Sequence, residues 1–164
     1  MTGAFAPGER GVGMSLLASP GGIVAVFPGG GVGLFGPTGF TRRPAVATLL
    51  APYEVDDPDG DVVTFDGLPR RTAAALLGVL PTNQGEVGTG DAPSFRELLD
   101  LTLRCPSARF RGYRASPRRF DERIALDGFV VRRKEMTAAV RARVDLLGPC
   151  EVTDDGRTVT VRWG

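Results

Sequence analysis

The chain has 164 residues, of which 42% are hydrophobic and 24% are charged, and none is histidine. This length and composition suit one folded domain and exclude wholesale disorder. The lack of histidine excludes Ser-His and Cys-His nucleophiles and all histidine-based metal sites.

The net charge of +1 conceals a strong polarity along the chain. Residues 1–103 carry 6 basic and 11 acidic side chains, a net charge of −5, whereas residues 104–164 carry 14 basic and 8 acidic side chains, a net charge of +6. Either the two halves face one another or the molecule has one positive face. Lys134 is the only lysine, and a GC-rich genome accounts for the excess of arginine without reference to function.

The sequence predicts a cytoplasmic protein without membrane contact, metal or cofactor. It shows no signal peptide, and no stretch approaches the ~20 apolar residues that a bilayer-spanning helix needs. Cys105 and Cys150 lack metal-ligand spacing, and each lies next to a proline. We interpret both as buried free thiols.

Residues 1–14 are rich in Gly, Ala and Pro and predict a loose N-terminal arm. Residues 31–36 then match G-x-G-x-x-G, the pattern of a dinucleotide-binding loop. Pro37 and Gly39 stand where the helix of such a site should continue, so the context favours a β-hairpin instead. Its strands are predicted over residues 23–27 and 32–35.

A second hairpin is predicted from residues 47–55 and 61–65, joined by an acidic turn over residues 56–60. The aspartates of this turn alternate as they do in a calcium-binding EF-hand loop. Val62 and Leu68, however, occupy the positions at which such a loop needs Gly and Glu. We therefore interpret the segment as a solvated Asp/Gly turn.

Two helices are predicted in the middle of the chain. Pro69 stands at the first position of one helix, and Pro81 ends it. Ser94 and Glu97 have the spacing of a capping box at the start of the next helix, which ends at Pro106.

Between these helices, residues 82–93 show no hydrophobic periodicity and are interpreted as a linker or surface loop. We expect a single domain over residues 1–164. Within it, this loop is the candidate boundary between two lobes, 15–81 and 94–164.

The C-terminal part of the chain predicts a hairpin, a helix and a second hairpin, over residues 123–133, 134–147 and 151–163. The first hairpin turns at Asp127-Gly128, and the second turns at residues 154–156. In the last strand, threonine and arginine alternate with Val159, Val161 and Trp163, the pattern of a half-buried strand.

The segment over residues 104–123 contains seven arginines interleaved with Phe and Tyr. Residues 108–115 predict a strand with Phe110 on one face and Arg109, Arg111 and Tyr113 on the other, followed by a loop over 116–119. These features define a candidate surface for an anion or a partner, made of Arg109, Arg111, Tyr113, Arg114, Arg118 and Arg119.

We favour a non-enzymatic accessory or interaction protein whose basic segment binds an acidic protein partner. A nucleic-acid-binding module is one alternative, because arginine pairs with phosphates and aromatic rings stack on bases. Another is a small enzyme that uses Tyr53, Tyr113, or the neighbouring acids Glu54 and Asp56. The segment also fits a structural role, in which its charges protect an edge strand or pair with the acidic first half.

The predicted fold class is α+β, with antiparallel β-hairpins packed against about three helices. Its core should contain ten hydrophobic residues: Phe65, Leu76, Leu77, Leu80, Leu98, Leu99, Phe110, Met136, Val140 and Val144.

Overall fold

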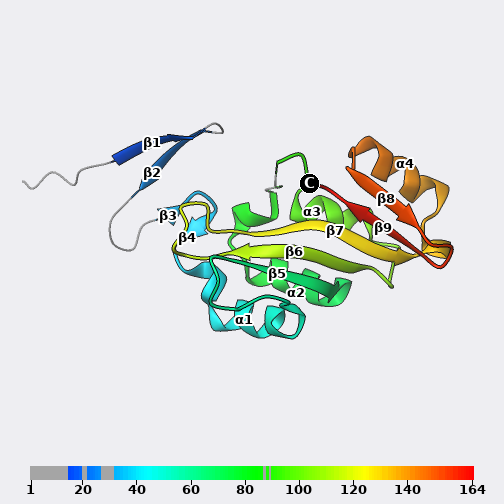
Figure 1. Cartoon of the computed structure of the whole chain (residues 1–164), viewed down its shortest axis with the longest axis horizontal. Coiled ribbons are helices and arrows are strands. Elements are labelled where there is room, and N and C mark those ends of the chain that lie inside the picture. Colours follow the sequence, from blue (N-terminus) through cyan, green and yellow to red (C-terminus); the bar gives the residue numbers. More distant parts are fainter. Residues whose placement is uncertain (1–14, 20–21, 27–31, 87, 89) are drawn as a thin grey trace, which may run out of the picture.

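The computed structural model describes residues 15–19, 22–26, 32–86, 88 and 90–164. In this part of the chain it contains a five-stranded antiparallel sheet and four α-helices, which confirms the predicted α+β class (Figure 1). The strands of this sheet are β5 (Val62–Pro69), β6 (Arg109–Ala115), β7 (Ile124–Arg132), β8 (Glu151–Asp154) and β9 (Thr158–Arg162). Their spatial order is β5-β6-β7-β9-β8, so β9 lies between β7 and the edge strand β8.

The helices pack on one face of this sheet. The α-helices are α1 (Pro44–Leu50), α2 (Arg70–Val79), α3 (Phe95–Leu101) and α4 (Ala138–Leu146). Short 3-10 helices are η1 (Phe40–Arg42), η2 (Ala51–Tyr53), η3 (Thr82–Glu86) and η4 (Arg133–Glu135). Alternate residues of the strands, such as Phe110, Phe129 and Val161, form one buried cluster with helix residues such as Leu76 and Leu98. We call the opposite side of the sheet the open face.

Two small sheets precede the main one. The strand β1 (Ser15–Ser19) pairs with β2 (Gly22–Val26), and β3 (Val32–Gly33) pairs with β4 (Gly36–Pro37). The predicted pairing of residues 23–27 with residues 32–35 is therefore wrong. In each small sheet, the two paired strands are separated by only two residues of the chain, the spacing of a tight hairpin. The predicted N-terminal arm and the turn between the predicted strands lie outside the described residues.

The predicted strand over residues 47–55 is also wrong, because α1 and η2 occupy most of it. Pro44 stands at the first helical position, where its missing N–H costs nothing and its fixed φ favours a helix. Val46 and Leu50, four residues apart, are both buried on the same side of α1. The last two residues of the predicted strand pair with β5 as predicted, through an isolated bridge from Glu54 to Phe65 and a hydrogen bond from the Val55 amide to the carbonyl oxygen of Thr64.

The predicted hairpin around Asp127-Gly128 is replaced by one continuous strand, β7. The register against β6 shifts at this point, since Arg111 pairs with Gly128 and Gly112 pairs with Leu126. Asp127 is therefore the extra residue of a β-bulge rather than part of a turn. A Cβ atom on Gly128 would lie 2.5 Å from the carbonyl oxygen of Val161, so glycine is needed for the close approach of β9.

Helix boundaries differ less from the predictions. The capping box of Ser94 and Glu97 is confirmed at the start of α3. The last helix starts later than predicted, because the hydroxyl of Thr137 accepts a hydrogen bond from the Val140 amide and caps α4 there. Residues 134–135 belong to η4 instead.

Eight of the ten predicted core residues are buried, and Leu77 and Met136 are half-buried against the same cluster. None of the helices in the described ranges has the length and apolarity that a membrane crossing requires.

Candidate binding surface on the open face of the sheet

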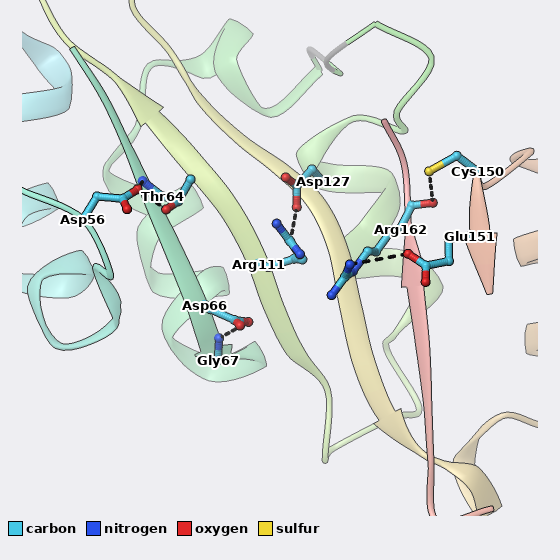
Figure 2. Close-up of polar contacts among 9 residues, drawn as sticks. All are labelled: Asp56, Thr64, Asp66, Gly67, Arg111, Asp127, Cys150, Glu151 and Arg162. Carbon is cyan, nitrogen blue, oxygen red and sulfur yellow. Dashed lines mark hydrogen bonds and ion pairs between the residues drawn. The ribbon is translucent and has the colours of Figure 1, made fainter. Parts of the chain in front are cut away.

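The strand β6 places Arg109, Arg111 and Tyr113 on the open face, the face that was predicted for them. The bulge at Asp127 brings the carboxylate of that residue to 2.9 Å from Nε of Arg111. Figure 2 shows this pair near the middle of the open face, with the Thr64 and Asp56 pair on one side of it and the Arg162 and Glu151 pair on the other.

Strands β7 and β9 add two arginines to this face that were not among the candidate residues. Arg162 lies opposite Gly128 in the ladder, and Arg132 lies opposite Thr158. The alternation in the last strand was a usable signal for Arg162. Arg132 was missed because its segment was taken for one arm of a hairpin rather than the end of a long strand.

Arg114 is not part of the open face, and its assignment to an exposed surface is wrong. It lies on the same side of β6 as Phe110 because side chains alternate along a strand. Its guanidinium lies 2.7 Å from the carboxylate of Glu54, and another of its hydrogen bonds goes to the carbonyl oxygen of Pro58 at 3.1 Å. Arg114 is therefore a buried structural residue.

Arg118 and Arg119 are exposed, in the loop after β6, but both are paired within the chain. Arg118 lies 2.9 Å from Asp61, and Arg119 lies 2.7 Å from Asp121. The hydrogen bond from Arg119 lowers the pKa of Asp121, and the same bond raises the pKa of Arg119. The predicted pairing of the basic segment with the acidic first half is thus present at two points, Arg114 with Glu54 and Arg118 with Asp61.

Tyr113 is half-buried on the open face. The guanidinium of Arg123 lies 5.5 Å from the centre of its ring and 5.9 Å from the ring of Phe35, both within the range of cation–π contact. One face of the Tyr113 ring is therefore in contact with a cation of the chain itself.

The antiparallel order places the start of β6, the end of β7 and the start of β9 at the same end of the sheet (Figure 1). Six exposed basic residues lie on these strand ends and the adjoining segments, and we call them the basic end: Arg104, Arg109, Arg132, Arg133, Lys134 and Arg157. Within the described residues, Arg133 is the only one of the six that forms an ion pair, with Asp154 at 3.1 Å. The backbone amide of Arg133 donates to the carbonyl oxygen of Arg157, which links β7 to the turn before β9.

Glu54 and Asp56, the neighbouring acids considered for catalysis, have different environments. Glu54 is paired with Arg114, whereas Asp56 is exposed and accepts hydrogen bonds from the amide and hydroxyl of Thr64. These bonds lower the pKa of Asp56, the direction opposite to that expected of a general acid. Across the described ranges, no cluster of three or more acidic or cysteine side chains is arranged to hold a metal ion.

The two thiols differ in environment. Cys105 is buried as predicted, and burial, reinforced by the nearby charge of Glu135, raises the pKa of its thiol. Cys150 is exposed, which contradicts the prediction, because it directly precedes the edge strand β8. Its sulfur lies 3.3 Å from the carbonyl oxygen of Arg162.

No protein-family model, curated protein or solved structure matches this chain.

Proposed function

We propose that this protein is a non-enzymatic binding module that uses the basic end and the adjoining open face to bind an acidic protein partner. The observation that carries this proposal is the set of exposed cations at the basic end, five of which form no ion pair within the described residues. Elsewhere in the basic segment the chain neutralises its own arginines, at Arg111, Arg118 and Arg119. The arginines of the basic segment that form no ion pair with a described residue, Arg104 and Arg109, therefore both belong to the basic end, where an acidic surface gains from complementary charge.

A protein partner is favoured over a single-stranded nucleic acid by the position of the aromatic residues. Binding of single strands combines basic grooves with aromatic rings on which successive bases stack. On the open face Tyr113 is half-buried beside Arg123. The more exposed Phe120 lies in the loop beyond the other end of β6, a strand that spans about 20 Å at roughly 3.3 Å per residue.

The test is recovery of binding partners from native cells with three forms of the protein. The first is the wild type, and the second is the double variant Arg109→Gln/Arg132→Gln at the basic end. The third is the control Arg42→Gln/Arg43→Gln, which removes the same charge from exposed positions in and next to η1. Each recovery is run with and without nuclease.

We expect the wild type to recover an acidic protein, and nuclease should not reduce this recovery. The control should recover the same protein, and the basic-end variant should not. After purification, this protein should bind directly, with an association rate that falls as salt is added. Recovery that disappears on nuclease treatment would instead favour nucleic acid. Equal recovery by all three forms would overturn the assignment of the surface.

A further inference from the structure

The basic end contains a hollow of about 270 Å³ on the open face. It is lined by Ser107, Arg109, Val130, Val131, Arg132 and Thr158. Small-molecule sites typically measure about 300–1,000 Å³, so this hollow has room for a single side chain rather than a large cofactor.

The strand register places two arginines on either side of one apolar residue. Arg109 lies directly opposite Val130, and Arg132 follows two residues later on the same face of β7. Such diagonal neighbours are separated by roughly 7–8 Å, a spacing at which two long side chains can reach the same group.

The guanidinium of Arg109 is held beside the hollow by its own backbone. Its Nη1 group donates to the carbonyl oxygens of Ser107 at 3.3 Å and Ala108 at 3.1 Å. Its Nε–H and Nη2 donors have no acceptor among the described residues, and neither has the guanidinium of Arg132.

Two carboxylates contact residues of the lining, and each is already hydrogen bonded. Glu135 accepts from the amide and the hydroxyl of Ser107, the latter at 2.5 Å. Asp155 accepts from the amide and hydroxyl of Thr158 and from the amide of Arg157. Neither carboxylate forms an ion pair with Arg109 or Arg132, so the Nε–H and Nη2 donors of Arg109 and the guanidinium of Arg132 stay available to a ligand.

We infer that this hollow binds one oxyanion carried on a side chain of the acidic partner, either a carboxylate or a phosphate. The planar forks of Arg109 and Arg132 match the geometry of both groups, and Val130 contacts the apolar stem of the incoming side chain. This assignment rests on the proposed function, because it names the group through which the partner is recognised.

The experiment uses three short, otherwise identical peptides with glutamate, phosphoserine or glutamine at the centre. Binding is followed by NMR through the Nε–Hε signals of the arginines in the full chain. The glutamate or the phosphoserine peptide should shift the signals of Arg109 and Arg132, and the glutamine peptide should not. The stronger binder identifies which oxyanion the hollow prefers.

Arg132→Gln should weaken binding of that peptide about tenfold, as expected for the loss of a charge-assisted hydrogen-bonded pair. Arg43→Gln, an exposed control, should leave it unchanged, and Arg109→Lys should weaken it despite keeping the charge.

Equal weakening by Arg43→Gln and Arg132→Gln, or shifts spread over all arginines, would overturn the site. Peptide binding without recovery of an acidic partner would retain the hollow and reject the proposed function. Recovery of an acidic partner without peptide binding would retain the proposed function and reject the hollow as the site of recognition.

Discussion

The guanidinium of Arg114 lies 2.7 Å from the carboxylate of Glu54, and both side chains are more than nine-tenths buried. Removing two charges from water is costly, and only close pairing with additional hydrogen bonds offsets that cost. Here the carbonyl oxygen of Pro58 provides one such bond. The pair therefore fixes the segment between η2 and β5 against β6.

Replacing Arg114 with methionine should lower the free energy of unfolding by about 3–5 kcal/mol, because it leaves Glu54 buried without a counter-charge. Arg118→Met removes an exposed pair with Asp61 and should cost less than about 1 kcal/mol. Urea unfolding of both variants measures the difference. Similar small losses in the two variants would contradict a structural role for Arg114.

Glu122 caps η1 from a distance of more than eighty residues along the chain. Its carboxylate accepts hydrogen bonds from the amide of Gly39 and from the amide and hydroxyl of Thr41, at 2.7–2.9 Å. Glu122→Gln replaces one accepting oxygen with an amide NH2 group, which cannot accept a hydrogen bond from these donors. The free energy of unfolding should therefore fall by about 1.5–3 kcal/mol. The matched change Glu86→Gln affects only the exposed pair with Arg96, so its thermal unfolding should stay near that of the wild type.

Two glycines should respond in opposite ways to the same added methyl group. A Cβ atom on Gly112 would collide with the carbonyl oxygen of Ala125 and lie 2.8 Å from the ring of Phe65. Gly112→Ala should therefore destabilise the fold by at least ~3 kcal/mol. Gly78 lies in α2, and beyond its own helical turn and chain neighbours no atom of the described residues lies within 4 Å of the added carbon, so Gly78→Ala should stabilise the protein by about 0.5–1 kcal/mol. A melting temperature of Gly112→Ala that rises together with that of Gly78→Ala would contradict the close packing of β6 against Ala125 and Phe65.

The two thiols should react at different rates with Ellman's reagent. In the native protein Cys150 should be modified quickly, whereas Cys105 should react at least about tenfold more slowly, because it is buried and its pKa is raised. Denaturant should equalise the two rates. Cys150→Ser identifies which thiol reacts, and rapid modification of that variant in its native state would contradict the burial of Cys105.

Asp121 should make stability depend on pH at the acid end. Its hydrogen bond with Arg119 lowers its pKa in the folded state below the unfolded value of about 3.9. The stabilisation is therefore fully present above the unfolded pKa and is lost as the pH falls through the lowered folded-state pKa. Asp121→Asn should be less stable than the wild type near pH 6, by less than about 1 kcal/mol because Arg119 is exposed. The difference should shrink as the pH falls from about 5 to about 2. A constant difference over this range would exclude the ion pair as its source.

The sequence by itself determined the features that depend on a few neighbouring residues. The capping box of Ser94 and Glu97 needs only two side chains three residues apart, and it forms as predicted. The faces of β6 and β9 follow from alternation along a strand, which placed Arg109, Arg111 and Tyr113 together. The α+β class and most of the core follow from the same local patterns.

Only the tertiary structure decided which residues meet across the chain. Asp127-Gly128 has the composition of a turn, but its pairing with β6 and β9 converts it into a bulge and brings Arg132 to the open face. The sequence left open whether the arginines of the basic segment face solvent or pair with the acidic first half of the chain. The fold divides this segment into the buried Arg114, the paired loop arginines, and Arg104 and Arg109, which belong to the basic end and form no ion pair in the described part of the chain. The physical reason is that burial and ion pairing depend on partners such as Glu54 and Asp61, whose distance from these arginines in space cannot be read from their separation in sequence.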